Sequence, residues 1–164
     1  MFRHVAALLI AASFCAHGAE LAVGSPAPTL EAKLLQSDEV MKVSGQQGLV
    51  TIVNLWATWC TPCLAEMPAL QSYYDRHKAQ GIRVLAISMD GPEAQPEVLN
   101  IAKNYTFPIA LKSGASLKGW GRIWRMPTTF VIDKQGVLRR NGHVGTPEVT
   151  LESLEAEVTP LLRQ

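Results

Sequence analysis

Cys60 and Cys63 are the residues of this chain best suited to carry chemistry, and Thr61 and Pro62 separate them. A Cys-x-x-Cys pair can bind a metal, attach haem, staple the chain or act as a reversible redox switch. Haem attachment of the c type requires a histidine directly after the second cysteine, but this chain has Leu64 there. The haem interpretation is therefore excluded and three remain.

The metal and staple interpretations are weak. Structural zinc usually needs four ligands, commonly in two separated pairs. Beyond the first twenty residues only His77 and His143 could join the cysteines, and they form no such pair. We interpret both histidines as ordinary surface residues and expect no metal. A bridge between Cys60 and Cys63 would close a very short loop, which contributes little chain-entropy stabilisation. The redox switch is favoured.

The redox interpretation gives the two cysteines different tasks. Residues 61–80 are predicted to form a helix, so Cys60 would lie where unpaired N–H groups and the helix dipole stabilise a thiolate. Cys63, one turn further on, should be less exposed and stay protonated until needed. Cys60 would attack a substrate disulfide, and Cys63 would resolve the mixed disulfide. The pair would alternate between a dithiol and a Cys60–Cys63 disulfide.

Residues 1–19 have the layout of a secretory signal peptide. Arg3 precedes an apolar stretch at 5–16, and small residues follow. This stretch is shorter than the roughly 20 residues that a membrane span requires. Cleavage would remove Cys15 and leave the Cys-x-x-Cys pair as the only thiols; the alternative is an uncleaved membrane anchor at 5–16. We expect residues 20–164 to form one domain, in the periplasm or another extracytoplasmic space.

The overall composition is that of an ordinary folded domain. The chain has 164 residues, with 15 Lys and Arg against 14 Asp and Glu, and 48% of its residues are hydrophobic. This length favours a single domain. Basic residues form no cluster of the kind that binds nucleic acid, so we expect no nucleic-acid partner.

Hydrophobic periodicity and turn residues predict an alternation of strands and helices. The expected strands are 30–34, 40–43, 49–56, 83–89, 107–111, 128–133 and 137–141, and the expected helices are 61–80, 93–104 and 148–162. The strand–helix–strand unit that contains the cysteines implies a parallel core with a right-handed crossover. The final hairpin adds an antiparallel edge. We therefore predict an α/β fold with a mixed central sheet and helices on both faces.

Three stretches of the sequence resemble one group of proteins. They are N-L-W-A-T-W-C-T-P-C at 54–63, A-E-M-P at 65–68 and M-P-T-T-F-V-I-D-K-Q-G at 126–136. From about Val23 to the C-terminus, the chain looks like the TlpA/ResA-like group of extracytoplasmic thioredoxin-fold thiol–disulfide oxidoreductases. The resemblance implies a thioredoxin fold with an N-terminal extension and a central insert, in agreement with the element order.

In the resembling group, a proline that faces the cysteines has a cis peptide bond, and the matching residue here is Pro127. The bond between Met126 and Pro127 is therefore expected to be cis. This would bring the backbone of Met126 beside Cys60, where an incoming peptide could pair as an added strand. Trp59 would lie beside the exposed sulfur of Cys60. The resemblance thus assigns Trp59, Met126 and Pro127 to substrate binding.

Glu66 is a third candidate catalytic residue, three positions after Cys63 and on the same helical face. In the resembling group an acidic residue here is linked to proton handling at the buried cysteine. A partly buried carboxylate has a raised pKa and could accept that proton. Thioredoxins carry aspartate at the position of Asn54, and asparagine cannot titrate. The alternative is that Glu66 is a solvated helix residue.

One departure from the thioredoxin pattern lies two residues before Pro127, where Arg125 replaces the usual glycine and follows Trp124. A cation and an aromatic ring near the docking edge could select an acidic or haem-bearing partner, or stabilise the thiolate. The alternative is a solvated rim. Trp56, at the end of its strand, is expected to pack in the core.

The function implied by the resemblance is reduction of disulfides in partner proteins, without a cofactor. The reductant would be a membrane thiol-electron transporter, and partners in the resembling group include apocytochromes c and copper-centre assembly factors. The alternatives are a disulfide oxidase or isomerase, and a non-catalytic docking module. A thioredoxin-fold peroxidase is disfavoured because the P-x-x-x-T-x-x-C context is absent and Trp59 precedes Cys60.

Overall fold

The fold is described here from a computed structural model, which defines residues 21–37, 39–45 and 48–164. The predicted signal segment, including Cys15, lies outside the described residues. Seven strands are present in the described part of the chain: β1 (Leu30–Leu34), β2 (Val40–Val43), β3 (Val50–Trp56), β4 (Ile82–Ser88), β5 (Ile109–Ala115), β6 (Thr128–Ile132) and β7 (Leu138–Arg140). The α-helices are α1 (Thr61–His77), α2 (Gln95–Ala102) and α3 (Leu151–Glu157).

The strands form one mixed sheet in the order β2-β1-β5-β4-β3-β6-β7. β3, β4 and β5 are parallel, while β1, β2, β6 and β7 pair antiparallel with their neighbours. β3 is buried along its whole length, as its apolar sequence predicted. The parallel core places the ends of β3 and β4 side by side, because Trp56 pairs with Ser88.

The C-terminal helix is shorter than the predicted 148–162. It begins after Thr150, whose hydroxyl accepts from the Ser153 N–H at 3.1 Å while the Ser153 hydroxyl accepts from the Thr150 N–H at 2.9 Å. This reciprocal cap satisfies N–H groups that the first helical turn leaves unpaired. After Glu157 the chain continues as a 3₁₀ segment, Thr159–Arg163, with Pro160 in its first turn. Proline removes a backbone donor and so disfavours a continued α-helix.

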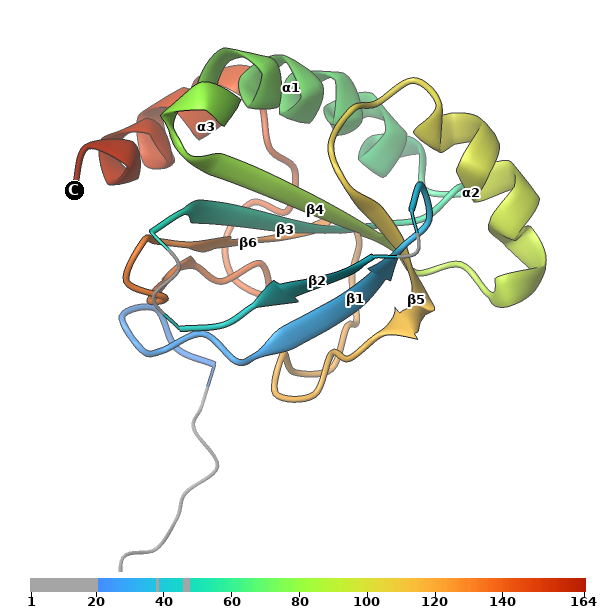
Figure 1. The fold of residues 1–164 in the computed structure, drawn as a ribbon, viewed down its shortest axis with the longest axis horizontal. Coiled ribbons are helices and arrows are strands. Elements are labelled where there is room, and N and C mark those ends of the chain that lie inside the picture. Colours follow the sequence, from blue (N-terminus) through green and yellow to red (C-terminus); the bar gives the residue numbers. More distant parts are fainter. Residues whose placement is uncertain (1–20, 38, 46–47) are drawn as a thin grey trace, which may run out of the picture.

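The sheet has a different cover on each face (Figure 1). All three α-helices contribute buried residues to one core, together with the cysteines. The core on the opposite face contains no buried residue from any described helix. Segments 21–29 and 116–125 cover that face instead, with Trp120 fully buried at its centre. The prediction of helices on both faces is therefore wrong for the described residues, because a long connection replaces a second helical layer.

The two histidines interpreted as surface residues both have packed positions. His77 is 8% exposed, and its Nε2 lies 3.0 Å from both carboxylate oxygens of Glu155 on α3. His143 is half-buried, and its Nε2 lies 2.8 Å from the Trp120 carbonyl. Both expectations were wrong because residues distant in the sequence cover these rings. No local sequence pattern predicts such contacts.

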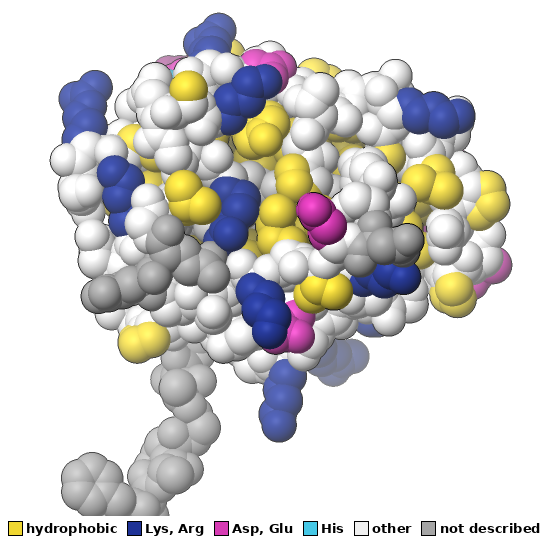
Figure 2. Space-filling model, in the orientation of Figure 1, with side chains coloured by type: hydrophobic (Ala, Val, Ile, Leu, Met, Phe, Trp, Pro, Cys, Tyr) yellow, Lys and Arg dark blue, Asp and Glu magenta, His cyan; other side chains and the backbone are white. Residues whose placement is uncertain are grey.

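On the face turned to the viewer, Lys and Arg side chains are scattered, with acidic and hydrophobic side chains between them (Figure 2). Trp56 is fully buried, in agreement with its predicted core position. Among the described residues, no helix is both long and apolar enough to cross a membrane.

Trp120 should stabilise the helix-free face of the sheet. Its ring packs edge-on against Phe130, with 5.0 Å between centroids, and its indole N–H donates to the Thr29 carbonyl at 3.4 Å. Trp120→Ala should lower the free energy of unfolding by about 3–5 kcal/mol in urea denaturation. Trp124→Ala, at a tryptophan that is 64% exposed, should lower it by less than about 0.5 kcal/mol. Equal losses for the two variants would contradict this role.

Candidate functional site

The site begins where β3 passes into α1. β3 ends at Trp56, and Cys60 is the N-cap of α1, with an extended backbone at φ −91° and ψ 93°. The Cys60 Sγ accepts a hydrogen bond from the Cys63 N–H at 3.3 Å. The first turn of α1 contains no acidic residue. The Cys63 N–H and the positive end of the helix dipole therefore both stabilise negative charge on the Cys60 sulfur.

Cys60 and Cys63 form a disulfide with an S–S distance of 2.03 Å and 5.2 Å between their Cα atoms. Cys63 is fully buried, as expected, but Cys60 is only 5% exposed. The expectation of an openly exposed Cys60 sulfur is therefore wrong for the disulfide form, because both cysteines belong to the helix-covered core. Among the neighbouring side chains, Trp59 is 70% exposed, and Thr61 and Pro62 are exposed as well.

Glu66 lies on the buried face of α1 and is 4% exposed. Its Oε1 accepts from the Asn54 side-chain amide at 2.7 Å, and its Oε2 accepts from the Val149 backbone N–H at 2.8 Å. Asn54 also donates to the Thr129 hydroxyl at 3.0 Å. The carboxyl group is thus held between β3 and the segment before α3. The alternative of a solvated helix residue is wrong.

Burial raises the pKa of the Glu66 carboxyl group from 4.5 to about 7. The hydrogen bonds from Val149 and Asn54 act in the opposite direction, because they stabilise the carboxylate. A pKa near neutrality allows a group both to accept and to release a proton under ordinary conditions. Glu66 and Cys63 lie one turn apart on the same buried helix face, which is compatible with the predicted proton transfer.

Asp90 is a buried residue of this site that the sequence analysis missed. It lies two residues after Ser88, the last residue of β4, and is 6% exposed. Its carboxylate accepts from the Ser88 hydroxyl at 2.7 Å, the Thr58 N–H at 2.9 Å and the Thr58 hydroxyl at 2.8 Å. These bonds tie the loop before Cys60 to the end of β4. The signal in the sequence was the polar pair Ser88 and Asp90 directly after an apolar strand.

A shallow groove of about 430 Å³ has Trp59, the residue directly before Cys60, in its wall. The residues that line it are Trp59, Met89, Ile123, Trp124, Arg125 and Met126. The peptide bond between Met126 and Pro127 is cis, as the resemblance implied. Two of the three residues assigned to substrate binding, Trp59 and Met126, therefore line one groove. Met89 and Ile123 were not predicted, because no local pattern marks them.

Arg125 has a defined place at this groove. Its Nε and Nη2 donate to the Gly142 carbonyl at 3.1 and 2.6 Å, and its Nη1 donates to the Gly145 carbonyl at 3.0 Å. The guanidinium also lies 5.2 Å from the centre of the Trp124 ring, which is 64% exposed. The alternative of a freely solvated rim is therefore wrong for Arg125.

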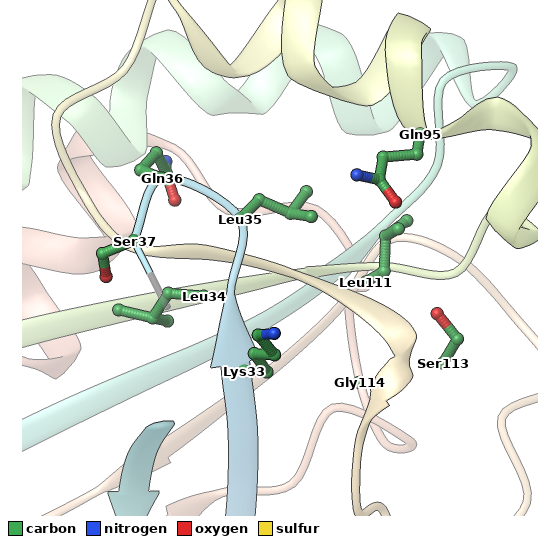
Figure 3. Close-up of a pocket in the computed structure, with 9 residues that line it drawn as sticks. All are labelled: Lys33, Leu34, Leu35, Gln36, Ser37, Gln95, Leu111, Ser113 and Gly114. Atoms are coloured by element: carbon green, nitrogen blue, oxygen red, sulfur yellow. The ribbon is translucent and has the colours of Figure 1, made fainter. Parts of the chain in front are cut away.

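A second hollow, of about 410 Å³, lies between the end of β1, β5 and the start of α2 (Figure 3). Leu35, Gln95 and Leu111 point toward one another in it. The Gln36 side chain accepts from the Ile109 N–H at 3.1 Å and donates to the Phe107 carbonyl at 3.4 Å, so it completes the strand contact. The hollow contains neither cysteine and none of the predicted site residues. In the described part of the chain, no cluster of three or more His, Cys, Asp or Glu residues could hold a metal ion.

Comparison with known proteins agrees with this geometry. A model of the AhpC/TSA family matches residues 23–141. The thiol-disulfide oxidoreductase ResA of Oceanobacillus iheyensis is 32% identical over 146 residues, which cover 87% of this chain and 74% of ResA. The crystal structure of StoA from Bacillus subtilis is 27% identical, covers 81% of this chain and 97% of its own, and gives a TM-score of 0.62.

A thiol:disulfide interchange protein of the thioredoxin family from Chlorobium tepidum has the same fold. It gives a TM-score of 0.71 at 23% identity and covers 86% of this chain and 98% of its own. The predicted thioredoxin fold is therefore confirmed, as is the resemblance to ResA-like proteins.

The raised pKa of Glu66 makes the stability of the disulfide form depend on pH. Between pH 4.5 and about 7 the unfolded chain releases the Glu66 proton while the folded protein retains it, so raising the pH favours unfolding. The stabilisation is complete below this window and is lost as the pH rises through the folded pKa. Across this pH window, the free energy of unfolding of the wild type should fall by about 3 kcal/mol relative to that of Glu66→Gln, which cannot titrate.

Denaturant unfolding of the oxidised proteins at several pH values measures this difference. Glu97→Gln, at an exposed position of α2, is the matched control and should keep the wild-type profile. Parallel profiles for the wild type and Glu66→Gln would show that burial does not shift the Glu66 pKa.

Proposed function

This chain belongs to the AhpC/TSA family, and from that premise we propose that it is an extracytoplasmic oxidoreductase that reduces disulfides in partner proteins. The relatives named thiol-disulfide oxidoreductase support the oxidoreductase class. The observation that carries the proposal is the Cys60–Cys63 pair at the start of α1, with the buried carboxyl group of Glu66 one turn beyond it.

The reaction begins with the dithiol form. The Cys60 thiolate, stabilised by the Cys63 N–H and the helix dipole, attacks one sulfur of the partner disulfide. A mixed disulfide forms, and the second partner sulfur leaves as a thiolate. Cys63 gives its proton to the Glu66 carboxylate and attacks the Cys60 sulfur. The partner sulfur that was bonded to Cys60 leaves as the other thiolate, and two electrons have passed to the partner. The protein is then in the disulfide form described above.

The donor that restores the dithiol is, in this proposal, a membrane thiol-electron transporter, and the reaction needs no cofactor because both electrons come from thiols. The partners expected from the family resemblance are apocytochromes c or copper-centre assembly factors. The predicted signal segment at residues 1–19 supports a place outside the cytoplasm, where disulfides form and persist.

The direction of electron flow is tested by equilibrium with glutathione buffers of defined ratio, with the Cys60–Cys63 disulfide quantified after alkylation. We expect a reduction potential close to that of thioredoxin, about −270 mV. A potential close to that of strongly oxidising proteins, about −120 mV, would contradict a reductase function and favour an oxidase function.

A trapping experiment separates the enzyme from a non-catalytic docking module. Cys63→Ser should accumulate mixed disulfides with partner proteins through Cys60, because no thiol remains to resolve them. They should disappear on treatment with a chemical reductant and be absent from the Cys60→Ser/Cys63→Ser double variant. A docking module would give no trapped species and would keep its activity in the cell without Cys63.

A further inference from the structure

The groove beside the disulfide is basic as well as apolar. Arg125 is the one charged residue among those that line it, and Arg122 is exposed directly before the lining residue Ile123. The stretch 112–132 contains four basic residues and no Asp or Glu: Lys112, Lys118, Arg122 and Arg125. The whole chain has a formal net charge of only +1, so positive charge is concentrated in the segment that borders the groove.

Among the described residues, Arg122 and Arg125 form no ion pair, unlike several other basic residues. Within the described residues, Lys42 pairs with Glu31 at 2.8 Å, and Arg140 pairs with Glu157 at 2.7 Å. No carboxylate of the described chain lies within salt-bridge distance of Arg122 or Arg125. Leaving an exposed cation unpaired in water costs little free energy, and the cation remains available to a negative charge on another molecule.

Arg125 is oriented for such an encounter. Three of its N–H groups donate to the carbonyls of Gly142 and Gly145, and these acceptors carry no net charge. A guanidinium has five N–H donors, so two remain, and its positive charge is not neutralised. Because the side chain is already held, little of its conformational freedom would be lost when an anion binds.

We propose that the preferred partner is a polypeptide with acidic residues beside its disulfide. An apolar side chain of the partner would occupy the space between Trp59 and Met126, and Asp or Glu residues flanking the cysteine would meet Arg125 and Arg122. This deepens the proposed function and rests on it, because Trp59, which lines the groove, directly precedes Cys60, and Met126, which also lines it, packs against the core that contains both cysteines.

The location of the groove favours a polypeptide over an anionic membrane. Exposed tryptophans and arginines are also found at membrane surfaces. Here, however, Arg125 lines a hollow together with Trp59 and Met126, and Trp59 directly precedes Cys60 of the buried disulfide. An extended chain that presents a disulfide to Cys60 fits such a hollow, whereas a flat lipid surface would have to stay outside it.

The test compares three synthetic peptides with the same internal disulfide and the same length, flanked by Glu, Gln or Lys pairs. Each is mixed with the pre-reduced protein, and the second-order rate constant of peptide reduction is measured by chromatography after acid quenching. At low ionic strength the Glu peptide should react about tenfold faster than the Lys peptide. The ratio should approach one at about 1 M salt, where the screening length is about 3 Å.

Variants assign the preference to the groove. The double change Arg122→Gln/Arg125→Gln should reduce the Glu-to-Lys ratio to about twofold or less. Arg125→Lys, which retains the charge, should preserve most of it. Lys103→Gln, an exposed cation at the end of α2 and outside the groove, is the charge-matched control and should leave the ratio unchanged. Equal rates for all peptides, or the same loss in Lys103→Gln, would overturn the proposal.

A binding measurement separates this proposal from the proposed function. Peptides with serine in place of both cysteines are titrated while tryptophan fluorescence is followed. Tighter binding of the Glu peptide, lost in Arg122→Gln/Arg125→Gln, supports the acidic partner even if no peptide is reduced, an outcome that would contradict only the reductase. Co-sedimentation with phosphatidylglycerol vesicles that depends on the same arginines, without peptide discrimination, would overturn the proposal in favour of a membrane.

Discussion

The structure depends on one junction, where a fully buried strand ends and a helix begins with a cysteine as its N-cap. β3 is covered on both faces, so its end is held rigidly, and α1 starts five residues later. The N–H groups of a first helical turn need acceptors, and here the Cys60 sulfur supplies one to Cys63. The interaction that satisfies the helix end is therefore the same one that favours a thiolate at Cys60. Local stability and reactivity have a common origin.

Two buried acids support this junction in different ways. Asp90 accepts three hydrogen bonds and fixes the loop that carries Trp59. Glu66 accepts only two, one on each oxygen, and burial raises its pKa to about 7. The three donors at Asp90 hold its surroundings in place. At Glu66, burial outweighs the two hydrogen bonds that stabilise the carboxylate, and the pKa lies near neutrality.

The segment that covers the helix-free face of the sheet also reaches the proposed partner surface. Three helices cover the face that holds the cysteines, while a long connection with Trp120 at its centre covers the other. The same connection continues through Ile123, Trp124 and Arg125 to the cis bond before Pro127. The segment that closes the second core thus also supplies one wall of the groove. The stability of that core and the geometry of the proposed docking surface therefore both depend on one stretch of the chain.

The sequence by itself determined the features that depend on neighbouring residues. The cis bond before Pro127 was expected from the family resemblance, whereas spacing placed the cysteines at a helix start and periodicity located every strand of the described sheet. Such features are local, so a short stretch of sequence contains their cause. The tertiary structure alone decided the contacts of Asp90, the covered positions of His77 and His143, and the single helical layer. Each of these features brings together residues that are far apart in the chain. When a distant segment buries a residue, the sequence around that residue shows no periodic pattern that would predict the burial.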